Sequence, residues 1–157
     1  MATTKKIGIC GSGIMGSGLA EVAAKAGYDV VVRSRSKATA EAMLASIEKG
    51  LDKQVQREKI SAEDKAAVLS RLSATDAVAD LKDCDLVIES VVEDLAVKKA
   101  LFAELDAAVK PGALLATNTS TLPVVEMAMA TSRPDRVCGI HFFNPATAMP
   151  LVEVVNP

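Results

Sequence analysis

The chain has 157 residues, a length typical of one domain with a full hydrophobic core. Half of its residues are hydrophobic and 24% are charged, which indicates a globular rather than a disordered protein. The formal net charge of -2 argues against a nucleic-acid partner. No apolar run reaches the roughly 18 residues of a membrane-spanning helix, so we expect no membrane partner either.

Three cysteines, Cys10, Cys84 and Cys138, lie far apart in the sequence. Their odd number and wide spacing fit neither a disulfide framework nor a metal site. We therefore expect reduced, buried, small side chains in a cytoplasmic protein that binds no metal.

Short apolar runs alternate with helical patterns along the chain, as in proteins built from βα units. The first half predicts a strand over 6–10, a helix over 15–25, a strand over 29–33, helices over 37–57 and 61–70, and a strand over 71–74. The second half predicts a strand over 86–91, a helix over 96–109, a strand over 113–117, a helix over 123–130, and strands over 137–142 and 151–155.

Two features depart from a simple alternation of strands and helices. The connection between the strands at 29–33 and 71–74 is about twice the usual length, which predicts a helical hairpin projecting from the sheet. The chain also stops directly after its last strand, which we expect to pair antiparallel with the strand over 137–142. Because parallel sheets are normally covered on both faces, we expect further structure beyond this end.

A glycine-rich stretch, Gly11-Ser12-Gly13-Ile14-Met15-Gly16, follows the first strand and opens the first helix. In this context the glycines permit a tight turn, close approach of a pyrophosphate, and packing of the helix on the strand. The helix N-terminus then offers free N–H groups and its positive dipole end to the phosphates. The sequence therefore predicts an α/β, Rossmann-type, doubly wound and mostly parallel sheet, with the projecting hairpin and the C-terminal antiparallel pair.

The end of the second strand bears on the choice of dinucleotide. NAD enzymes usually place an acid there to bind the adenosine ribose, but this chain has Ser34 between Arg33 and Arg35. A small hydroxyl and two guanidinium groups suit a 2′-phosphate, which slightly favours NADP over NAD. The alternative is that both arginines are solvated surface charges and that NAD still binds.

Polar residues follow three further strands at the edge where open α/β sheets bind their ligands. The strand over 86–91 is followed by Val92-Glu93-Asp94 and then Lys98, and the strand over 113–117 by Asn118-Thr119-Ser120-Thr121. The strand over 137–142 leads into His141-Phe142-Phe143-Asn144-Pro145. This pattern indicates a binding site, although loops gather at the same edge in any such sheet.

His141 is the single histidine of the chain, and its side chain suits proton transfer near neutral pH. Without context, a histidine at a strand end is more often structural. Glu153 lies on the opposite side of its strand from Val152 and Val154, and antiparallel pairing would bring it to face His141. A carboxylate there would fix the tautomer of the histidine and stabilise its charged form. The alternative for Glu153 is an ordinary surface residue.

Taken together, these residues resemble the N-terminal domain of 3-hydroxyacyl-CoA dehydrogenases, including the bacterial 3-hydroxybutyryl-CoA dehydrogenases. The resemblance covers essentially the whole chain. Its most specific parts are Val87-Ile88-Glu89-Ser90-Val91-Val92-Glu93, Asn118-Thr119-Ser120, His141-Phe142-Phe143-Asn144-Pro145 and Leu151-Val152-Glu153.

The resemblance implies hydride transfer between NAD(P) and the 3-hydroxyl or 3-keto carbon of an acyl-CoA. His141 would be the base, Glu153 would orient it, and Ser120 would bind the reacting oxygen beside the nicotinamide. Glu93, Lys98, Asn118 and Asn144 would be cofactor positions.

The resemblance also implies that the hairpin lies along the CoA. Its basic residues Lys53, Arg57 and Lys59 are candidates for binding the CoA phosphates, or alternatively form a solvated helix face.

This sequence departs from the family pattern in two respects. Ser34 stands where the family usually has an acid, and the following helical domain is absent. In the family that domain dimerises the protein, closes the cleft and supplies a further catalytic asparagine, so we expect the isolated domain to be weakly active or inactive. Two alternatives remain, a β-hydroxyacid dehydrogenase acting on a free acid through a lysine, and a non-catalytic dinucleotide-binding module.

Overall fold

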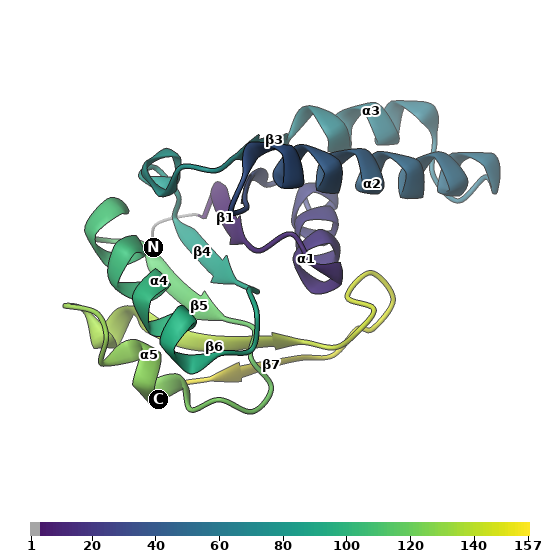
Figure 1. Ribbon diagram of the computed structural model, residues 1–157. Coiled ribbons are helices and arrows are strands. Elements are labelled where there is room, and N and C mark those ends of the chain that lie inside the picture. The colour runs from purple at the N-terminus through teal and green to yellow at the C-terminus, as the bar shows by residue number, and fades with distance from the viewer. Residues whose placement is uncertain (1–3) are drawn as a thin grey trace.

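Seven strands form one sheet in the order β3-β2-β1-β4-β5-β6-β7 in the computed structural model, which describes residues 4–157 (Figure 1). The strands are β1 (Lys6–Cys10), β2 (Asp29–Arg33), β3 (Leu72–Thr75), β4 (Leu86–Glu89), β5 (Leu114–Thr117), β6 (Val137–Phe142) and β7 (Val152–Val155). Neighbouring strands are parallel except for the antiparallel pair of β6 and β7. The predicted fold class is therefore confirmed.

Helices cover both faces of this sheet. They are α1 (Ile14–Lys25), α2 (Lys37–Gln56), α3 (Ala62–Ser70), α4 (Leu95–Ala108) and α5 (Val124–Ala128), with 3₁₀ turns η1 (Val78–Leu81) and η2 (Pro134–Arg136). One core cluster joins α1, α2 and α3 to one face, and a second joins η1, α4 and α5 to the other. The central strands β1, β2, β4 and β5 are mostly apolar because both of their faces are buried, whereas β7 at the edge is exposed.

The predicted helical hairpin is formed by α2 and α3, which extend beyond the sheet in Figure 1. Ser36 caps α2, and Ser61 with Asp64 forms a capping box on α3. Along α2, Met43, Ile47 and Leu51 point into the core at helical spacing. The hairpin is therefore anchored on the sheet by one apolar stripe, while its outer face stays free.

Some boundaries differ from the sequence prediction. β4 ends at Glu89 instead of continuing to Val91, because the Glu89 side chain accepts the N–H of Val91 at 2.7 Å and ends the strand ladder. The helix expected over 123–130 is shorter, since the N–H of Ala130 bonds three residues back to Met127 and tightens its last turn. The 3₁₀ turns η1 and η2 were not predicted from the sequence.

The cysteines are free thiols. Cys10 and Cys84 are buried as expected, and burial raises their pKa values to about 12 and about 11. The expectation was wrong for Cys138, which is only partly buried where it packs against the rim of the first core cluster. Within residues 4–157 no helix is long and apolar enough to cross a membrane, and no cluster of His, Cys, Asp or Glu is placed to hold a metal ion.

Two helical glycines offer a matched test of the packing. A Cβ at Gly16 would lie 2.2 Å from the backbone oxygen of Gly11, whereas a Cβ at Gly50, a half-buried position within α2, would meet no atom within 4 Å. We expect Gly16→Ala to destabilise the protein by about 1–3 kcal/mol through steric overlap. Gly50→Ala should stabilise it by about 0.5–1 kcal/mol through helix propensity. Urea unfolding measures both, and a Gly16→Ala protein as stable as the wild type would contradict this account.

Candidate active site

The glycine turn brings the end of β1 against the end of β4. Gly11 has a φ of +125°, and a Cβ there would lie 2.2 Å from the backbone oxygen of Ser90. Nothing lies within 4 Å of the place where a Gly13 Cβ would be. No side chain caps α1, and its first turn holds no acid. The free N–H groups, the dipole and the open space over Gly13 fit a pyrophosphate.

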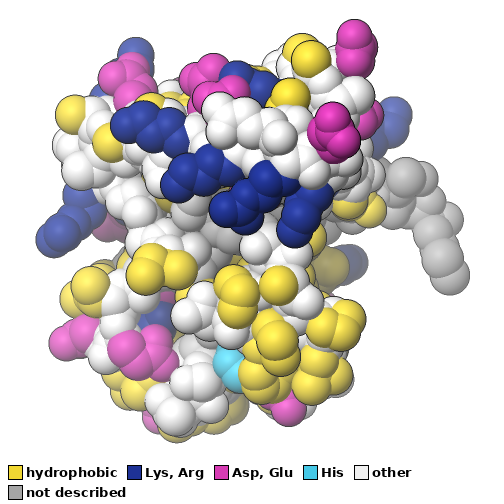
Figure 2. Space-filling view, turned by 90° about the vertical axis from the view of Figure 1, so that its right-hand side faces the viewer, with side chains coloured by type: hydrophobic (Ala, Val, Ile, Leu, Met, Phe, Trp, Pro, Cys, Tyr) yellow, Lys and Arg dark blue, Asp and Glu magenta, His cyan; other side chains and the backbone are white. Residues whose placement is uncertain are grey.

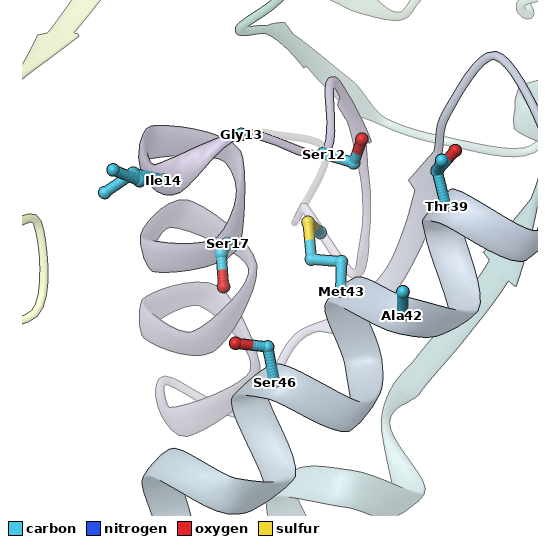
Figure 3. Close-up of a pocket in the computed structure, with 8 residues that line it drawn as sticks. All are labelled: Ser12, Gly13, Ile14, Ser17, Thr39, Ala42, Met43 and Ser46. Atoms are coloured by element: carbon cyan, nitrogen blue, oxygen red, sulfur yellow. The ribbon is translucent and has the colours of Figure 1, made fainter.

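A cavity of about 490 Å³ lies between α1 and α2, beside this turn (Figure 3). Ser17 of α1 and Ser46 of α2 face each other across it, whereas Ile14 points away. The contribution of α2 was not predicted from the sequence, although the three- and four-residue spacing of its lining residues puts them on one helix face. The cavity is lined by Ser12, Gly13, Ile14, Ser17, Thr39, Ala42, Met43 and Ser46.

At the end of β2, Ser34 is buried within a cluster of hydroxyl groups. Its Oγ lies 2.8 Å from Ser12 Oγ and 2.6 Å from Thr39 Oγ1, so it joins the glycine turn to the start of α2. Arg33 donates from Nε to the backbone oxygen of Asp76 at 3.3 Å, and Arg35 is exposed. The position that holds an acid in typical NAD sites therefore holds a neutral hydroxyl between two cations.

A second cavity, of about 300 Å³, collects the polar residues expected at the carboxyl edge. It brings together side chains that follow β4, β5 and β6, together with Met15 from the glycine-rich stretch. The parallel strands explain this convergence, because their carboxyl ends lie at one edge of the sheet. The lining residues are Met15, Ser90, Val91, Glu93, Lys98, Asn118, Ser120, His141, Phe142, Phe143 and Asn144.

His141 and Glu153 are directly opposite each other in the antiparallel pair of β6 and β7. His141 Nδ1 lies 2.8 Å from Glu153 Oε2. Because a carboxylate only accepts hydrogen bonds, a neutral His141 donates from Nδ1 to Glu153 and leaves its lone pair on Nε2. The pairing predicted from the sequence places a histidine with the tautomer of a general base in the second cavity.

The ends of β5 and β6 are held together by Asn118. Its side-chain oxygen accepts the backbone N–H of Phe142 at 2.8 Å, next to His141. On the other side, the ring of Phe143 packs against the His141 ring with 4.6 Å between centroids. Asn118 therefore positions the histidine strand as well as lining the cavity.

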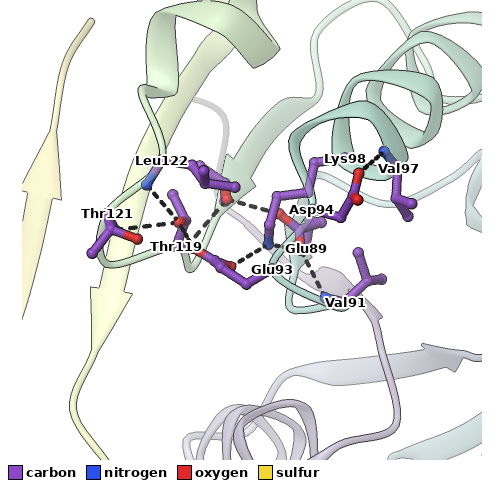
Figure 4. Close-up of polar contacts among 10 residues, drawn as sticks. Glu89, Val91, Glu93, Asp94, Val97, Lys98, Thr119, Thr121 and Leu122 are labelled. Atoms are coloured by element: carbon purple, nitrogen blue, oxygen red, sulfur yellow. Dashed lines mark hydrogen bonds and ion pairs between the residues drawn. The ribbon is translucent and has the colours of Figure 1, made fainter.

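Behind the second cavity lies a buried ion pair (Figure 4). Lys98 Nζ donates to Glu89 Oε1 at 2.6 Å and lies 3.1 Å from Glu93 Oε2, at the cavity wall. Thr119 donates its hydroxyl proton to Glu93. Partial burial opposes ionisation of Glu93, but the hydrogen bonds from Thr119 and Lys98 outweigh it and hold its pKa below the ordinary value.

The role of Glu89 was not predicted from the sequence, although a signal for it was present. An acid inside an otherwise apolar strand needs a charged or hydrogen-bonding partner when buried. Glu89 is 0% exposed and Lys98 only 1%. Lys98, expected to contact a cofactor, is thus held between two carboxylates where it lines the cavity.

Removing one partner of this pair should be costly. We expect Lys98→Met to destabilise the protein by about 3–5 kcal/mol, because Glu89 is left as a buried and unpaired charge. The neighbouring Lys99, whose ion pair with Glu126 is exposed, provides the control, and Lys99→Met should cost less than about 1 kcal/mol. Urea unfolding compares them. Equal losses for the two variants would contradict the structural role of the buried pair.

Comparison with known proteins places this geometry in a family. The profile described as "3-hydroxyacyl-CoA dehydrogenase, NAD binding domain" matches residues 6–157. A 3-hydroxybutyryl-CoA dehydrogenase from Clostridioides difficile is 46% identical over 151 residues, which cover 96% of this chain and 54% of that protein. One from Bradyrhizobium diazoefficiens is 45% identical over 155 residues, covering 99% and 53%.

Solved structures agree with these sequence matches. The (S)-3-hydroxybutyryl-CoA dehydrogenase of Ralstonia eutropha superposes with a TM-score of 0.95 at 36% identity, over 98% of this chain and 54% of that one. The present chain spans about half the length of the curated relatives it matches. The chain belongs to the 3-hydroxyacyl-CoA dehydrogenase family and corresponds to its NAD-binding domain.

Proposed function

We propose that this chain is the dinucleotide-binding part of an NAD(P)-dependent oxidoreductase that acts on the 3-hydroxyl or 3-keto carbon of an acyl-CoA. 3-Hydroxybutyryl-CoA and acetoacetyl-CoA are the representative substrates. The observation that carries the proposal is the placement of His141, paired with Glu153 at 2.8 Å, in one cavity with Ser120. The names of the relatives support the acyl-CoA substrate class.

The chemistry assigned to these side chains is proton transfer and orientation. Nε2 of His141 takes the proton of the substrate 3-hydroxyl, and Glu153 stabilises the resulting imidazolium. Ser120 donates a hydrogen bond to the reacting oxygen. In the reductive direction His141 returns the proton to that oxygen. When bound, the nicotinamide ring supplies the hydride chemistry.

We assign the dinucleotide phosphates to the glycine turn and propose NADP as the preferred form. The N-terminus of α1 supplies free N–H groups for the pyrophosphate. Ser34 lacks the charge that would repel a 2′-phosphate, and Arg33 and Arg35 flank it with positive charge. The hydroxyl cluster of Ser34, Ser12 and Thr39, in which only Ser34 is buried, offers further hydrogen bonds near that position.

The CoA phosphates are assigned to the outer face of α2. Ser46 lines the first cavity, and Lys49, Lys53 and Arg57 continue its row at spacings of three and four residues. All three basic residues are exposed, as is Lys59 in the turn after the helix. Figure 2 shows Lys and Arg side chains along the lobe that faces the histidine across a hollow. Lys49 was missed in the sequence analysis, although the helical spacing points to it.

The free-acid alternative is less well supported. That class commonly relies on a catalytic lysine, and Lys98, which lines the second cavity, is already bonded to Glu89 and Glu93. We propose further that the complete protein carries a second, helical part that closes the cleft and forms a homodimer. The exposed apolar residues Val152 and Val154 of β7, 38% and 72% exposed, fit a surface for such a part to cover.

Replacing the histidine tests the chemistry. In a protein extended to the full length of its Clostridioides difficile relative, His141→Gln should lower turnover of acetoacetyl-CoA by about 10²–10⁴-fold, because the general base and acid is lost. The dissociation constant of the dinucleotide should change by less than about threefold, since His141 is not assigned to dinucleotide binding. Turnover retained by His141→Gln would show that another group moves the proton. No turnover by the extended wild type would overturn the proposed function.

The proposed NADP preference has its own test in the 157-residue chain. The wild type should bind NADP⁺ more tightly than NAD⁺ in calorimetric titration, and Ser34→Asp should weaken NADP⁺ binding at least about tenfold through charge repulsion. Ser70→Asp, which adds the same charge at the exposed end of α3, is the control and should leave both affinities unchanged. Tighter binding of NAD⁺ than of NADP⁺ by the wild type would refute the preference.

A further inference from the structure

The two ends of the proposed dinucleotide site carry opposite charge. At the end of β2, Arg33 and Arg35 flank Ser34, close to the uncapped N-terminus of α1. The second cavity, at the ends of β4, β5 and β6, is instead walled by Glu93 and backed by further carboxylates. An oxidised nicotinamide dinucleotide has the same polarity, with anionic phosphates and a cationic ring. Its reduced form has a neutral ring.

The charges around the second cavity do not cancel. The ammonium of Lys98 is shared between Glu89 at 2.6 Å and Glu93 at 3.1 Å, so one negative charge is left over. Behind His141, Glu153 adds another carboxylate. Glu89 is fully buried and forms the closer pair with Lys98, whereas the Glu93 side chain is 46% exposed. The surplus negative charge therefore lies on Glu93, at the cavity wall.

Glu93 is also held in place and kept ionised. It accepts a hydrogen bond from Thr119, directly before Ser120, and its pKa is held below the ordinary value against the opposing effect of partial burial. A carboxylate held by hydrogen bonds at a cavity wall keeps its charge at a fixed place, so it acts on a nearby charge more strongly than a freely moving side chain on an open surface. The cavity wall thus presents a permanent negative charge next to the residue assigned to the reacting oxygen.

We propose that Glu93 sets the relative affinity of this site for the two oxidation states of the dinucleotide. Its negative charge stabilises the cationic ring of the oxidised form and gives no comparable help to the neutral ring of the reduced form. The inference rests on the proposed function, which puts the nicotinamide in the cavity of Ser120 and His141. It assigns to Glu93 a further role, in which the charge of its side chain distinguishes the oxidised from the reduced dinucleotide, whatever hydrogen bond the side chain makes.

Glu93→Gln separates charge from contact. Glutamine keeps the size of the side chain and one hydrogen-bonding oxygen but removes the charge, while the buried pair of Glu89 and Lys98 remains intact. We expect the ratio of dissociation constants, oxidised over reduced, to rise about five- to tenfold, the size of one charge interaction near a protein surface. Loss of a contact alone would change both dissociation constants by the same factor.

The 157-residue chain suits this measurement, because it contains no tryptophan to interfere with the fluorescence of the reduced dinucleotide. NADPH is titrated directly by its fluorescence, and NADP⁺ by displacement of NADPH. Glu126→Gln, which removes an equal charge from the exposed pair between Glu126 of α5 and Lys99 of α4, is the control. For this control, the ratio of dissociation constants, oxidised over reduced, should match that of the wild type. Thermal unfolding of each variant checks that it is folded.

The dependence of the wild-type ratio on salt concentration provides a second measurement. Raising the ionic strength from about 0.02 to about 0.5 M screens partly exposed charges, so the wild-type ratio should rise toward that of Glu93→Gln, whose ratio should change less. An unchanged ratio in Glu93→Gln, with both forms still bound, would overturn the inference and leave the proposed function standing. If neither NADPH nor NADP⁺, nor NADH nor NAD⁺, binds the wild type, both are overturned.

Discussion

Glu89 occupies the point where the central strand of the sheet reaches the candidate site. It is a carboxylate without exposure to water, and its oxygens accept from the backbone of Val91, from Lys98 and from Thr117. A buried charge is tolerated only when it is neutralised and hydrogen-bonded in this way. The consequence is that the ends of β4 and β5 and the start of α4 are held as one unit, which carries Glu93 and Ser120 at its rim.

The sheet order supplies the rest of the arrangement. From β1 the chain adds β2 and β3 on one side of the sheet, and it then crosses over to add β4, β5 and β6 on the other side. The strand order therefore reverses between β1 and β4, and a crevice opens beside the carboxyl ends of these two strands. The glycine turn lies in this crevice with an uncapped helix behind it, and the arginines follow β2. On the other side Glu93 follows β4, and Glu153 lies in β7. The reversal of strand order between β1 and β4 therefore separates two ends of the site. The end that suits the phosphates is positive, and the end near His141 and Glu153 is negative.

Much of this could be predicted from the sequence, where local signals were strong. The alternation of apolar runs with helical patterns indicated the sheet, and the doubled connection after β2 indicated the hairpin. The position of Glu153 in its strand predicted the face that meets His141, because side chains alternate along a strand. In each case the signal depends on residues close together in the sequence.

What escaped prediction depends on contacts between distant segments. The early end of β4 follows from the Glu89 side chain, and the neutralisation of Lys98 needs the distance between two elements. The first cavity forms only where α1 and α2 pack together, and the partial exposure of Cys138 depends on its place at the rim of the first core cluster. The helical spacing on α2 is enough to add Lys49 to the predicted basic residues. It does not reveal the cavity beside which these residues lie.

The central claim is that Ser120 and His141 bind the reacting oxygen of an acyl-CoA. The most direct measurement is a crystal structure of the protein, extended to the length of its relatives, with acetoacetyl-CoA bound. The account predicts the C3 oxygen within hydrogen-bond distance of both His141 Nε2 and Ser120 Oγ, with the CoA phosphates along α2. An acyl group bound away from the second cavity, or a C3 oxygen contacting neither side chain, would contradict it.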